Sequence, residues 1–221
     1  MTDVIILAGG FGTRLAGTLP GVPKILAPIC GIPFVEILLR WLQPLGCVVF
    51  ALGHLAEQVQ RYLGSREGIE FSVEKKSLGT GGALLQALPK TTSSTVLVIN
   101  GDSFFDISLP DFHRFHAAHG GLASIASLKK ADVRRYGSLT FEEKDGRVVS
   151  MEPSGWINAG LYLLDRSLLA GEALRSCSLE AELLPHWIEK GIFAYRNRGT
   201  FIDIGTAESY RDAQKILAAW I

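Results

Sequence analysis

An uninterrupted apolar run near the N-terminus, which leads almost directly into a glycine-rich stretch, constrains the fold of this chain more than any other feature. Residues 4–7 are all aliphatic, and residues 9–17 contain four glycines. A strand that is apolar at every position is buried on both faces, as in a parallel sheet covered by helices. The glycines let backbone N–H groups approach an anion without interference from Cβ atoms. The N-terminus therefore predicts an α/β fold with an anion-binding loop after its first strand.

Strand patterns alternate with helical patterns along the chain. We predict strands at residues 4–7, 47–52, 69–74, 95–99, 123–128, 160–164, 193–196 and 200–204, and helices at residues 33–45, 55–63, 80–88, 109–119, 179–190 and 206–220. A hairpin is expected over residues 136–151, with Asp145-Gly146 as its turn, and Thr206 is placed to cap the last helix. Such alternation implies right-handed βαβ units on an open sheet. With no repeat or linker in its 221 residues, the chain is expected to form a single domain.

The composition argues against several classes of function. Lys+Arg and Asp+Glu both number 22, so the formal net charge is zero, unlike that of a general nucleic-acid or membrane-surface binder. The three cysteines are too far apart to indicate a zinc site or a disulfide framework. The sequence has neither a basic signal-peptide start nor an apolar run of about 20 residues, so we expect a cytoplasmic protein.

The loop after the first strand differs from two common glycine motifs. A dinucleotide-binding fingerprint beginning at Gly10 would need a glycine where Leu15 stands, and a P-loop would need a lysine where Thr18 stands. A tight turn that merely needs flexible residues is the simplest alternative. Arg14 in the loop and Lys24 after it favour a polyphosphate site, because a nucleoside triphosphate brings about four negative charges that must be countered.

The motif LAGGFGTRL at residues 7–15, followed by Pro23-Lys24, resembles the signature of the sugar-1-phosphate nucleotidyltransferase family. The resemblance covers nearly the whole chain. It implies a three-layer, Rossmann-like α/β fold of the nucleotide-diphospho-sugar transferase type, with a mixed, mainly parallel sheet and helices on both faces. It also implies one nucleotidyltransferase domain over residues 1–221, with a nucleotide-binding half at about 1–108 and a sugar-phosphate-binding half at about 109–221. The loop residues implied in nucleotide binding are Leu7, Ala8, Gly9, Gly10, Gly12 and Thr13, with Arg14 and Lys24 on the phosphates.

A second motif, EKKSLGTGGAL at residues 74–84, stands where a predicted strand gives way to a helix. By itself it could be an ordinary strand-to-helix turn. Its glycines would let the backbone lie flat against a base, and Thr80 adds a hydroxyl. The motif resembles the nucleobase-binding segment of the family, which implies nucleotide contacts from Glu74, Gly79, Thr80 and Gly81. Its LGTxGxL form is most similar to the guanylyltransferase branch, so GTP is the preferred nucleotide.

Two distant aspartates are candidates for a metal site. Asp102 follows an apolar strand, and the carboxyl ends of strands are where ligands bind in open α/β sheets. A turn aspartate that bonds its own backbone is the alternative. Asp203 lies between apolar neighbours, where a charge is costly unless a cation or strong donors accompany it. The resemblance implies that both aspartates hold Mg²⁺, which prefers one or two carboxylates together with phosphate oxygens and water.

Several segments of the second half match those that line the sugar pocket in the family. The resemblance implies sugar-phosphate contacts from Arg135, Tyr136, Gly137, Glu152 and Asn158. The family often has a Glu-Lys-Pro motif here, whose lysine binds the sugar phosphate. This chain reads Met151-Glu152-Pro153, so that lysine is missing. Arg135, Lys129 or Lys130 could substitute for it, and the sequence does not choose among them.

Together these assignments imply an in-line displacement, in which a sugar 1-phosphate attacks the α-phosphorus of an NTP and pyrophosphate leaves. The reacting oxygens arrive ionised, so positioning and charge neutralisation suffice. The catalytic candidates are Arg14, Lys24, Asp102 and Asp203. The motifs most resemble the branch that acts on D-glycero-D-manno-heptose 1-phosphate. A mannose-1-phosphate guanylyltransferase, another NTP or sugar specificity, and a regulatory module without catalysis stay open as alternatives.

Overall fold

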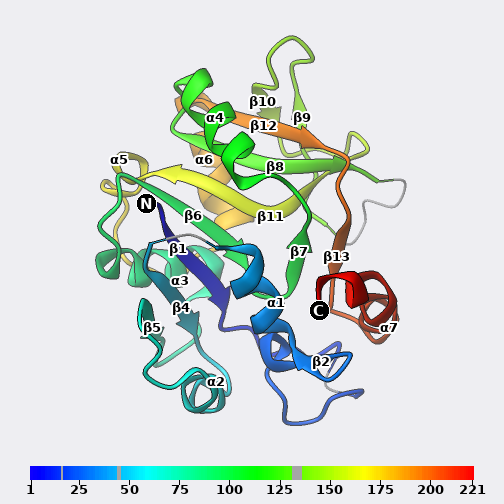
Figure 1. Ribbon diagram of the computed structural model, residues 1–221. Coiled ribbons are helices and arrows are strands. Elements are labelled where there is room, and N and C mark those ends of the chain that lie inside the picture. Colours follow the sequence, from blue (N-terminus) through cyan, green and yellow to red (C-terminus); the bar gives the residue numbers. More distant parts are fainter. Residues whose placement is uncertain (16, 44–45, 131–135) are drawn as a thin grey trace.

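A seven-stranded mixed sheet forms the centre of the protein (Figure 1). The computed structural model describes residues 1–15, 17–43, 46–130 and 136–221. The strand order is β12-β8-β11-β6-β1-β4-β5, with β1 (Asp3–Ala8), β4 (Val48–Leu52), β5 (Ile69–Val73), β6 (Thr95–Asn100), β8 (Ala123–Lys129), β11 (Trp156–Asp165) and β12 (Ile192–Asn197). Neighbouring strands are parallel except at β11, which is antiparallel to both β6 and β8. The mixed, mainly parallel sheet predicted from the sequence is confirmed.

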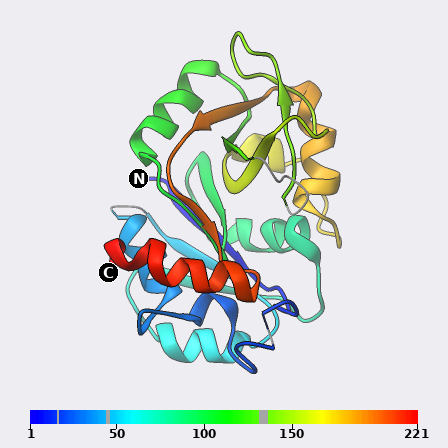
Figure 2. The same cartoon turned by 90° about the vertical axis from the view of Figure 1, so that its right-hand side faces the viewer.

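Helices cover both faces of the sheet (Figure 2). One face packs against α1 (Phe34–Trp41), α2 (Ala56–Leu63), α4 (Leu109–His119) and α7 (Ala207–Ile216), and the other against α3 (Gly79–Ala87), α5 (Arg166–Leu169) and α6 (Leu184–Trp187). Alternate strand residues serve the two layers, so that Val4 and Ile6 of β1 join the first core and Ile5 joins the second. Burial of both faces stabilises this predicted three-layer arrangement. Within the described ranges, no helix is long and apolar enough to cross a membrane.

The described residues also form three short antiparallel strand pairs outside the main sheet. They are β2 (Pro28–Ile29) with β3 (Ile32–Pro33), β7 (Ser103–Phe105) with β13 (Phe201–Asp203), and β9 (Thr140–Phe141) with β10 (Val148–Ser150). Strands β9 and β10 form the predicted hairpin, and at its turn the Arg147 N–H donates to Asp145 Oδ1 (2.9 Å). Strand β7 did not show in the sequence periodicity, because it has only three residues and follows closely after β6.

The helix predicted at residues 179–190 is broken into three short pieces. A π-helical turn (Leu179–Leu183) leads into α6, and a 3₁₀ turn (Ile188–Lys190) follows it. Pro185 lies in the first turn of α6 and has no N–H to donate, so a continuous α-helical hydrogen-bond pattern is impossible there. The predicted cap of the last helix is confirmed, because Thr206 Oγ1 accepts the Ser209 N–H (3.2 Å). Single-turn 3₁₀ helices also occur at Lys24–Leu26, Leu88–Lys90 and Leu217–Trp220.

Strand β11 begins earlier than the strand predicted at residues 160–164. Its pairing with β8 is interrupted between Asn158 and Tyr162, and Gly160 in the interruption has φ +69°. A glycine adopts this conformation without the strain that a Cβ would cause. The sequence predicted a strand that begins at Gly160, whereas the structure has a bulge at this glycine inside one longer strand.

The topology brings the polar ends of the strands to one edge of the sheet. Strands β1, β4, β5, β6 and β8 run in the same direction, so their carboxyl ends share this edge, and the antiparallel β11 begins there. Gly9, Glu74, Asn100 and Lys130 stand at or just after strand ends, and Asn158 lies near the start of β11. Ligands of open α/β sheets bind at this edge, so the candidate site is expected here.

Candidate active site

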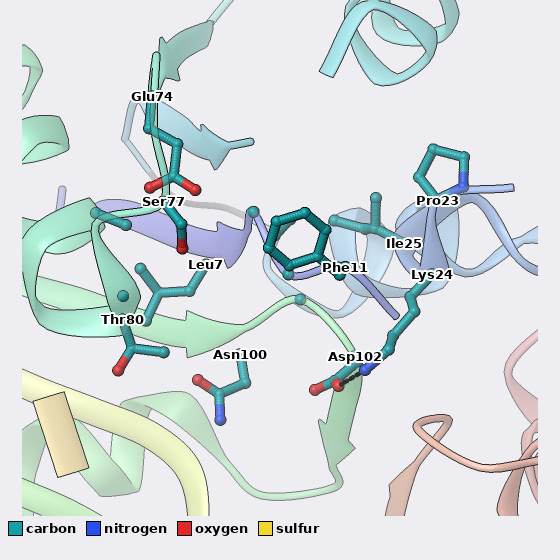
Figure 3. Close-up of a pocket in the computed structure, with 16 residues that line it drawn as sticks. Leu7, Phe11, Pro23, Lys24, Ile25, Glu74, Ser77, Thr80, Asn100 and Asp102 are labelled. Carbon is teal, nitrogen blue, oxygen red and sulfur yellow. Dashed lines mark hydrogen bonds and ion pairs between the residues drawn. The ribbon is translucent and has the colours of Figure 1, made fainter. Parts of the chain in front are cut away.

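A cavity of about 250 Å³ opens at the carboxyl ends of β1, β5 and β6 (Figure 3). The glycine loop after β1 and the start of α3 both contribute to its walls. Among the residues predicted to bind nucleotide, phosphate or metal, it is lined by Leu7, Ala8, Gly9, Gly10, Lys24, Glu74, Gly79, Thr80 and Asp102. The structure therefore brings the two glycine motifs of the sequence together around one space.

Glu74 lines this cavity (Figure 3). Its carboxylate lies beside the backbones of two glycines. Its Oε2 accepts a hydrogen bond from the Leu78 N–H (2.8 Å). A Cβ at Gly9 would lie 3.2 Å from Glu74 Oε1, and a Cβ at Gly53 would collide with the same oxygen. Glycine at both positions leaves room for the carboxylate. The cavity thus contains a fixed carboxylate acceptor at the end of β5.

The start of α3 packs closely against a distant segment of the chain. The Gly81 N–H donates to Cys177 O (2.9 Å), and a Cβ at Gly81 would lie 2.8 Å from Cys177 Sγ. The Thr80 hydroxyl donates to Glu180 Oε2 (2.7 Å) and accepts the Leu179 N–H (2.9 Å). Both residues therefore have a packing role, and the nucleobase contacts expected of Thr80 and Gly81 stay predictions.

An ion pair joins the two predicted phosphate and metal ligands at this cavity. Lys24 Nζ lies 2.9 Å from Asp102 Oδ2 (Figure 3). The lysine side chain passes Gly12, where a Cβ would lie 3.3 Å from Lys24 Cγ. Thr13, by contrast, is exposed, and the described lining of the cavity does not include it. The pair holds a cation and a carboxylate side by side at the cavity wall, where a phosphate or a metal ion would compete for them.

A second cavity, of about 240 Å³, adjoins the first and shares Asn100 and Asp102 with it. Of the predicted site residues, its lining includes Arg14, Tyr136, Gly137, Asn158 and Asp203. The side-chain Oδ1 of Asn100 is buried and has no hydrogen-bond partner in the part of the chain that the structure describes. Many of the residues predicted for the nucleotide and for the sugar phosphate thus line two cavities that meet at Asn100 and Asp102, whereas Gly12 and Gly81 lie outside the described lining of both.

The two aspartates predicted as a metal pair converge from neighbouring strands. In the β7–β13 pair, Asp203 stands opposite the residue that follows Asp102. A Cβ at Gly205 would lie 3.0 Å from Asp203 Oδ1, 3.8 Å from Asp102 Oδ2 and 3.7 Å from Arg14 Nη2. Asp203 is only 8% exposed and accepts hydrogen bonds from the Gly205 N–H (3.1 Å) and the Tyr136 hydroxyl. Two carboxylates and a guanidinium therefore surround one point beside the second cavity.

A divalent cation fits this donor set when substrate oxygens complete its coordination. Carboxylate oxygens of the kind that Asp102 and Asp203 offer are the ligands that hard cations prefer. Among residues 1–15, 17–43, 46–130 and 136–221, no group of three or more His, Cys, Asp or Glu side chains could hold a metal by itself. Mg²⁺ usually binds through one or two carboxylates together with phosphate oxygens and waters. The pair suits a cation that arrives with a phosphorylated substrate.

A chain of hydrogen bonds links the two cavities through side chains that the sequence motifs did not reveal. Glu180 accepts from Thr80 on one side and from the Tyr162 hydroxyl on the other (3.2 Å). Tyr162 in turn accepts from Asn158 Nδ2 (3.0 Å), and Asn158 Oδ1 accepts the Gly160 N–H (2.9 Å). Burial, and then the charge of Glu180, raise the pKa of Tyr162 well above its ordinary value, so the phenol stays protonated. In the sequence, Glu180 looks like an ordinary acidic residue in the first turn of a helix.

The remaining sugar-phosphate candidates differ in their relation to the second cavity. Arg135 lies outside the described residues. Glu152 is exposed after β10, and the described lining does not include it, so its sugar contact stays a prediction. Lys129 ends β8 and is exposed, whereas Lys130 is half-buried and its Nζ lies 3.0 Å from the Tyr136 hydroxyl oxygen.

Comparison with known proteins gives matches over nearly the full chain. A family model described as "Nucleotidyl transferase" matches residues 3–219. The chain is 32% identical to the D-glycero-alpha-D-manno-heptose 1-phosphate guanylyltransferase of Aneurinibacillus thermoaerophilus, over 99% of this chain and 100% of that protein. It is also 32% identical to mannose-1-phosphate guanyltransferase beta-B of Xenopus laevis, over 93% of this chain and 62% of that protein. HddC from Yersinia pseudotuberculosis, solved also in complex with GMP-PN, superposes with a TM-score of 0.85 at 31% identity, over 97% of this chain and 99% of HddC.

Proposed function

Because this chain belongs to the nucleotidyl transferase family, we propose that it transfers a guanylyl group from GTP to a sugar 1-phosphate, with D-glycero-D-manno-heptose 1-phosphate as the sugar, and releases pyrophosphate. Full-length similarity to a heptose 1-phosphate guanylyltransferase supports both the reaction and the sugar. The GMP-PN complex of HddC supports a guanine nucleotide. Similarity to a mannose-1-phosphate guanyltransferase supports guanylyl transfer and makes mannose 1-phosphate the second candidate for the sugar.

The observation that carries the proposal is the pair of adjoining cavities at the carboxyl edge of the sheet. The first is lined by the glycine loop, Lys24 and Glu74, which suit a nucleotide. The second is lined by Asn158 and Tyr136, whose directional polar atoms suit a polyol. They meet at Asp102, so two phosphorylated ligands would bring their phosphates together there. This arrangement suits a two-substrate transfer better than the binding of one effector.

Glu74 supports guanine as the base. Guanine offers N–H donors at its N1 position and on its N2 amino group. The fixed carboxylate of Glu74 can only accept hydrogen bonds while it is ionised, so it complements such donors. Adenine has no donor pair of this kind on the same edge, so the carboxylate disfavours ATP.

We assign the chemistry to positioning and charge neutralisation. An oxygen of the sugar phosphate forms a new bond to the α-phosphorus of GTP, the bond from that phosphorus to the bridging oxygen breaks, and pyrophosphate leaves with the electron pair. Because the attacking oxygen is already ionised, no side chain has to remove a proton. Arg14 and Lys24 would neutralise charge on the α-phosphate and on the departing pyrophosphate. Asn158 and Tyr136 would hold the sugar in line for the attack.

Nucleotidyltransferases of this family use a divalent metal. For this chain we propose Mg²⁺, held by Asp102 and Asp203 together with substrate phosphate oxygens. When bound, it would supply positive charge to the reacting phosphates. The convergence of the two carboxylates near Gly205 supports this assignment.

A pyrophosphate-release assay tests the proposal. The four common NTPs are each combined with the 1-phosphates of heptose, mannose and glucose, with and without Mg²⁺. We expect release with GTP and heptose 1-phosphate at the highest kcat/KM. Preference for mannose 1-phosphate would replace the sugar and keep the reaction. Binding of GTP without pyrophosphate release from any pair would instead indicate a regulatory protein without catalysis.

A further inference from the structure

The second cavity poses a problem of charge. Its lining carries the carboxylates of Asp102, Asp203 and Glu180, which are balanced by Arg14 in the described lining, by Lys24 paired with Asp102, and by the proposed Mg²⁺. A sugar 1-phosphate would add about two negative charges, and like charges at such distances repel each other strongly outside bulk water. A further cation close to this cavity would therefore lower the cost of binding the phosphate.

Lys130 stands where such a cation is needed. It follows β8, and the carboxyl end of this strand lies at the same edge as the ends of β1 and β6. Its Nζ is 3.0 Å from the hydroxyl oxygen of Tyr136, which lines the second cavity and donates to Asp203. The ammonium also lies over the ring faces of Tyr136 (4.4 Å to the centroid) and Phe201 (5.1 Å). Phe201 lines the cavity as well.

The aromatic contacts fix the position of the charge. An ammonium over a ring face is attracted by the ring quadrupole, and two such rings restrict a side chain that is otherwise flexible. The backbone is held too, because the Lys130 N–H donates to Gly155 O (2.9 Å). The neighbouring Lys129 has the same charge but is exposed, and it is paired across the sheet with Trp156. Only Lys130 of these two is directed at cavity-lining side chains.

Resting on the proposed function, we infer that Lys130 binds the phosphate of the sugar 1-phosphate. It would take the place of the lysine of the Glu-Lys-Pro motif, which this chain lacks because it reads Met151-Glu152-Pro153. No covalent step involves Lys130. Its ammonium donates hydrogen bonds to phosphate oxygens and offsets the carboxylates of the cavity.

Steady-state kinetics of Lys130→Ala test this inference, with Lys129→Ala as the matched control. Loss of one charge-assisted hydrogen bond should raise the KM for the sugar 1-phosphate about 10- to 100-fold. The KM for GTP should change less than about 2-fold, because the first cavity is not touched. Lys130→Arg should recover most of the loss, since it restores a cationic donor. Lys129→Ala should behave like the wild type.

Equal KM values for Lys130→Ala and the wild type would overturn the inference. A large increase in the KM for the sugar 1-phosphate in Arg135→Ala, with none in Lys130→Ala, would do the same.

Two further measurements separate this role from others. Calorimetric titration with the sugar 1-phosphate reports on Lys130 without requiring turnover, so a wild type that binds but does not react would refute the proposed function and still test Lys130. A double-mutant cycle with Tyr136→Phe tests a merely structural role. If Lys130 acts on the ligand, its effect persists when the Tyr136 hydroxyl is absent. If Lys130 only orders Tyr136, the effect disappears in that background and the inference is wrong.

Discussion

Two buried aspartates, one at the amino ends of the parallel strands of the central sheet and one beside their carboxyl ends, differ in almost everything except their burial. Asp3 begins β1 and is 6% exposed, and Asp203 ends β13 and is 8% exposed. Asp3 lies at the amino edge of the parallel strands, whereas Asp203 lies at the carboxyl edge beside the second cavity. A buried carboxylate is costly unless its surroundings compensate it, so the partners of each aspartate show what it is there for.

Backbone N–H groups supply most of the hydrogen bonds to Asp3, and the Thr92 hydroxyl donates a further one to Oδ2 (3.3 Å). Asp3 Oδ2 accepts the N–H groups of Thr92 (2.6 Å) and Ser93 (3.0 Å), and its Oδ1 accepts that of Cys47 (3.0 Å). Burial alone would raise the pKa of Asp3, but these hydrogen bonds outweigh burial and hold the pKa below its ordinary value. The carboxylate joins the segments that enter β4 and β6 to the start of β1. Its role is to stabilise the fold.

Asp203 has a different set of neighbours. Besides the Gly205 N–H and the Tyr136 hydroxyl, it faces the carboxylate of Asp102 and the guanidinium of Arg14 across the position of Gly205. Two carboxylates that converge beside a cavity repel each other. Stabilisation of the fold does not explain why they are placed together. Burial alone therefore does not identify a functional carboxylate. The partners of the carboxylate are more informative. Backbone N–H donors indicate a role in stabilising the fold, whereas a second carboxylate and a cationic side chain indicate a functional site.

Asp203→Asn, which preserves the shape of the side chain and removes its charge, tests most directly whether Asp203 acts in catalysis. We expect at least about a 100-fold loss of kcat in the pyrophosphate-release assay, the size typical of losing one strong electrostatic contact in an active site. The midpoint of urea unfolding should stay close to that of the wild type, because an amide oxygen can still accept the Gly205 N–H. Asp102→Asn is the companion variant. Near-normal turnover in either variant would remove that residue from the proposed metal site.

Asp3→Asn should give the opposite result. The amide places N–H donors against backbone N–H donors, so at least one buried hydrogen bond to a charged group is lost. We expect a decrease of about 2 kcal/mol in the free energy of unfolding, measured in urea. The folded variant should keep the kcat of the wild type. A fall in kcat without a fall in stability would mean that Asp3 influences the site, and the contrast with Asp203 would not hold.

A structural feature could be predicted from the sequence when the residues that determine it are neighbours in the chain. The first strand, the alternating helices and the Thr206 cap follow from neighbouring residues, and the structure confirms them. The convergence of Asp102 and Asp203 was expected only through family resemblance, since nothing in their spacing brings them together. Local patterns gave no sign that Asp3 would bond three separate backbone N–H groups. Those contacts form only once the sheet is assembled.

Other misses have the same physical origin. The bulge at Gly160 depends on how β11 pairs with β8, whereas the local pattern predicted only a strand that begins at this glycine. Glu180 has no distinctive pattern in its own segment. Its role depends on hydrogen bonds from Thr80 and Tyr162, which are distant in sequence. The choice between Lys129 and Lys130 depends on which of two adjacent side chains turns inward as β8 ends. Composition and spacing do not determine that.

Glu180→Gln tests a carboxylate whose partners are side-chain hydroxyls. They differ both from the backbone donors of Asp3 and from the charged neighbours of Asp203. The carboxylate accepts from both Thr80 and Tyr162, whereas glutamine would present a donor to one of them. The orientation of Asn158, which depends on Tyr162, should then be less well fixed. We expect about a 10-fold loss of kcat/KM for the sugar 1-phosphate. Glu182→Gln is the matched control, because Glu182 is exposed and paired with Arg175. Equal losses in both variants would argue against a specific role for Glu180.

The dependence of the unfolding free energy on acid pH should separate the contribution of the Asp3 charge from that of its hydrogen-bond geometry. We expect this effect to be the smallest of those predicted here. The pKa of Asp3 in the folded protein lies below the ordinary value of 3.8, so the folded state binds this proton less readily than the unfolded chain. The stabilisation by Asp3 is therefore fully present at pH values well above 3.8. It is lost as the pH falls through the lower pKa of the folded state. The difference in unfolding free energy between the wild type and Asp3→Asn should be constant from about pH 7 to pH 5 and should narrow below about pH 4. Urea titrations at three or four pH values measure it. If the difference in unfolding free energy stays constant down to about pH 3, the stabilisation comes from hydrogen-bond geometry rather than from charge. Asp3 would then differ from Asp203 in electrostatics as well as in location.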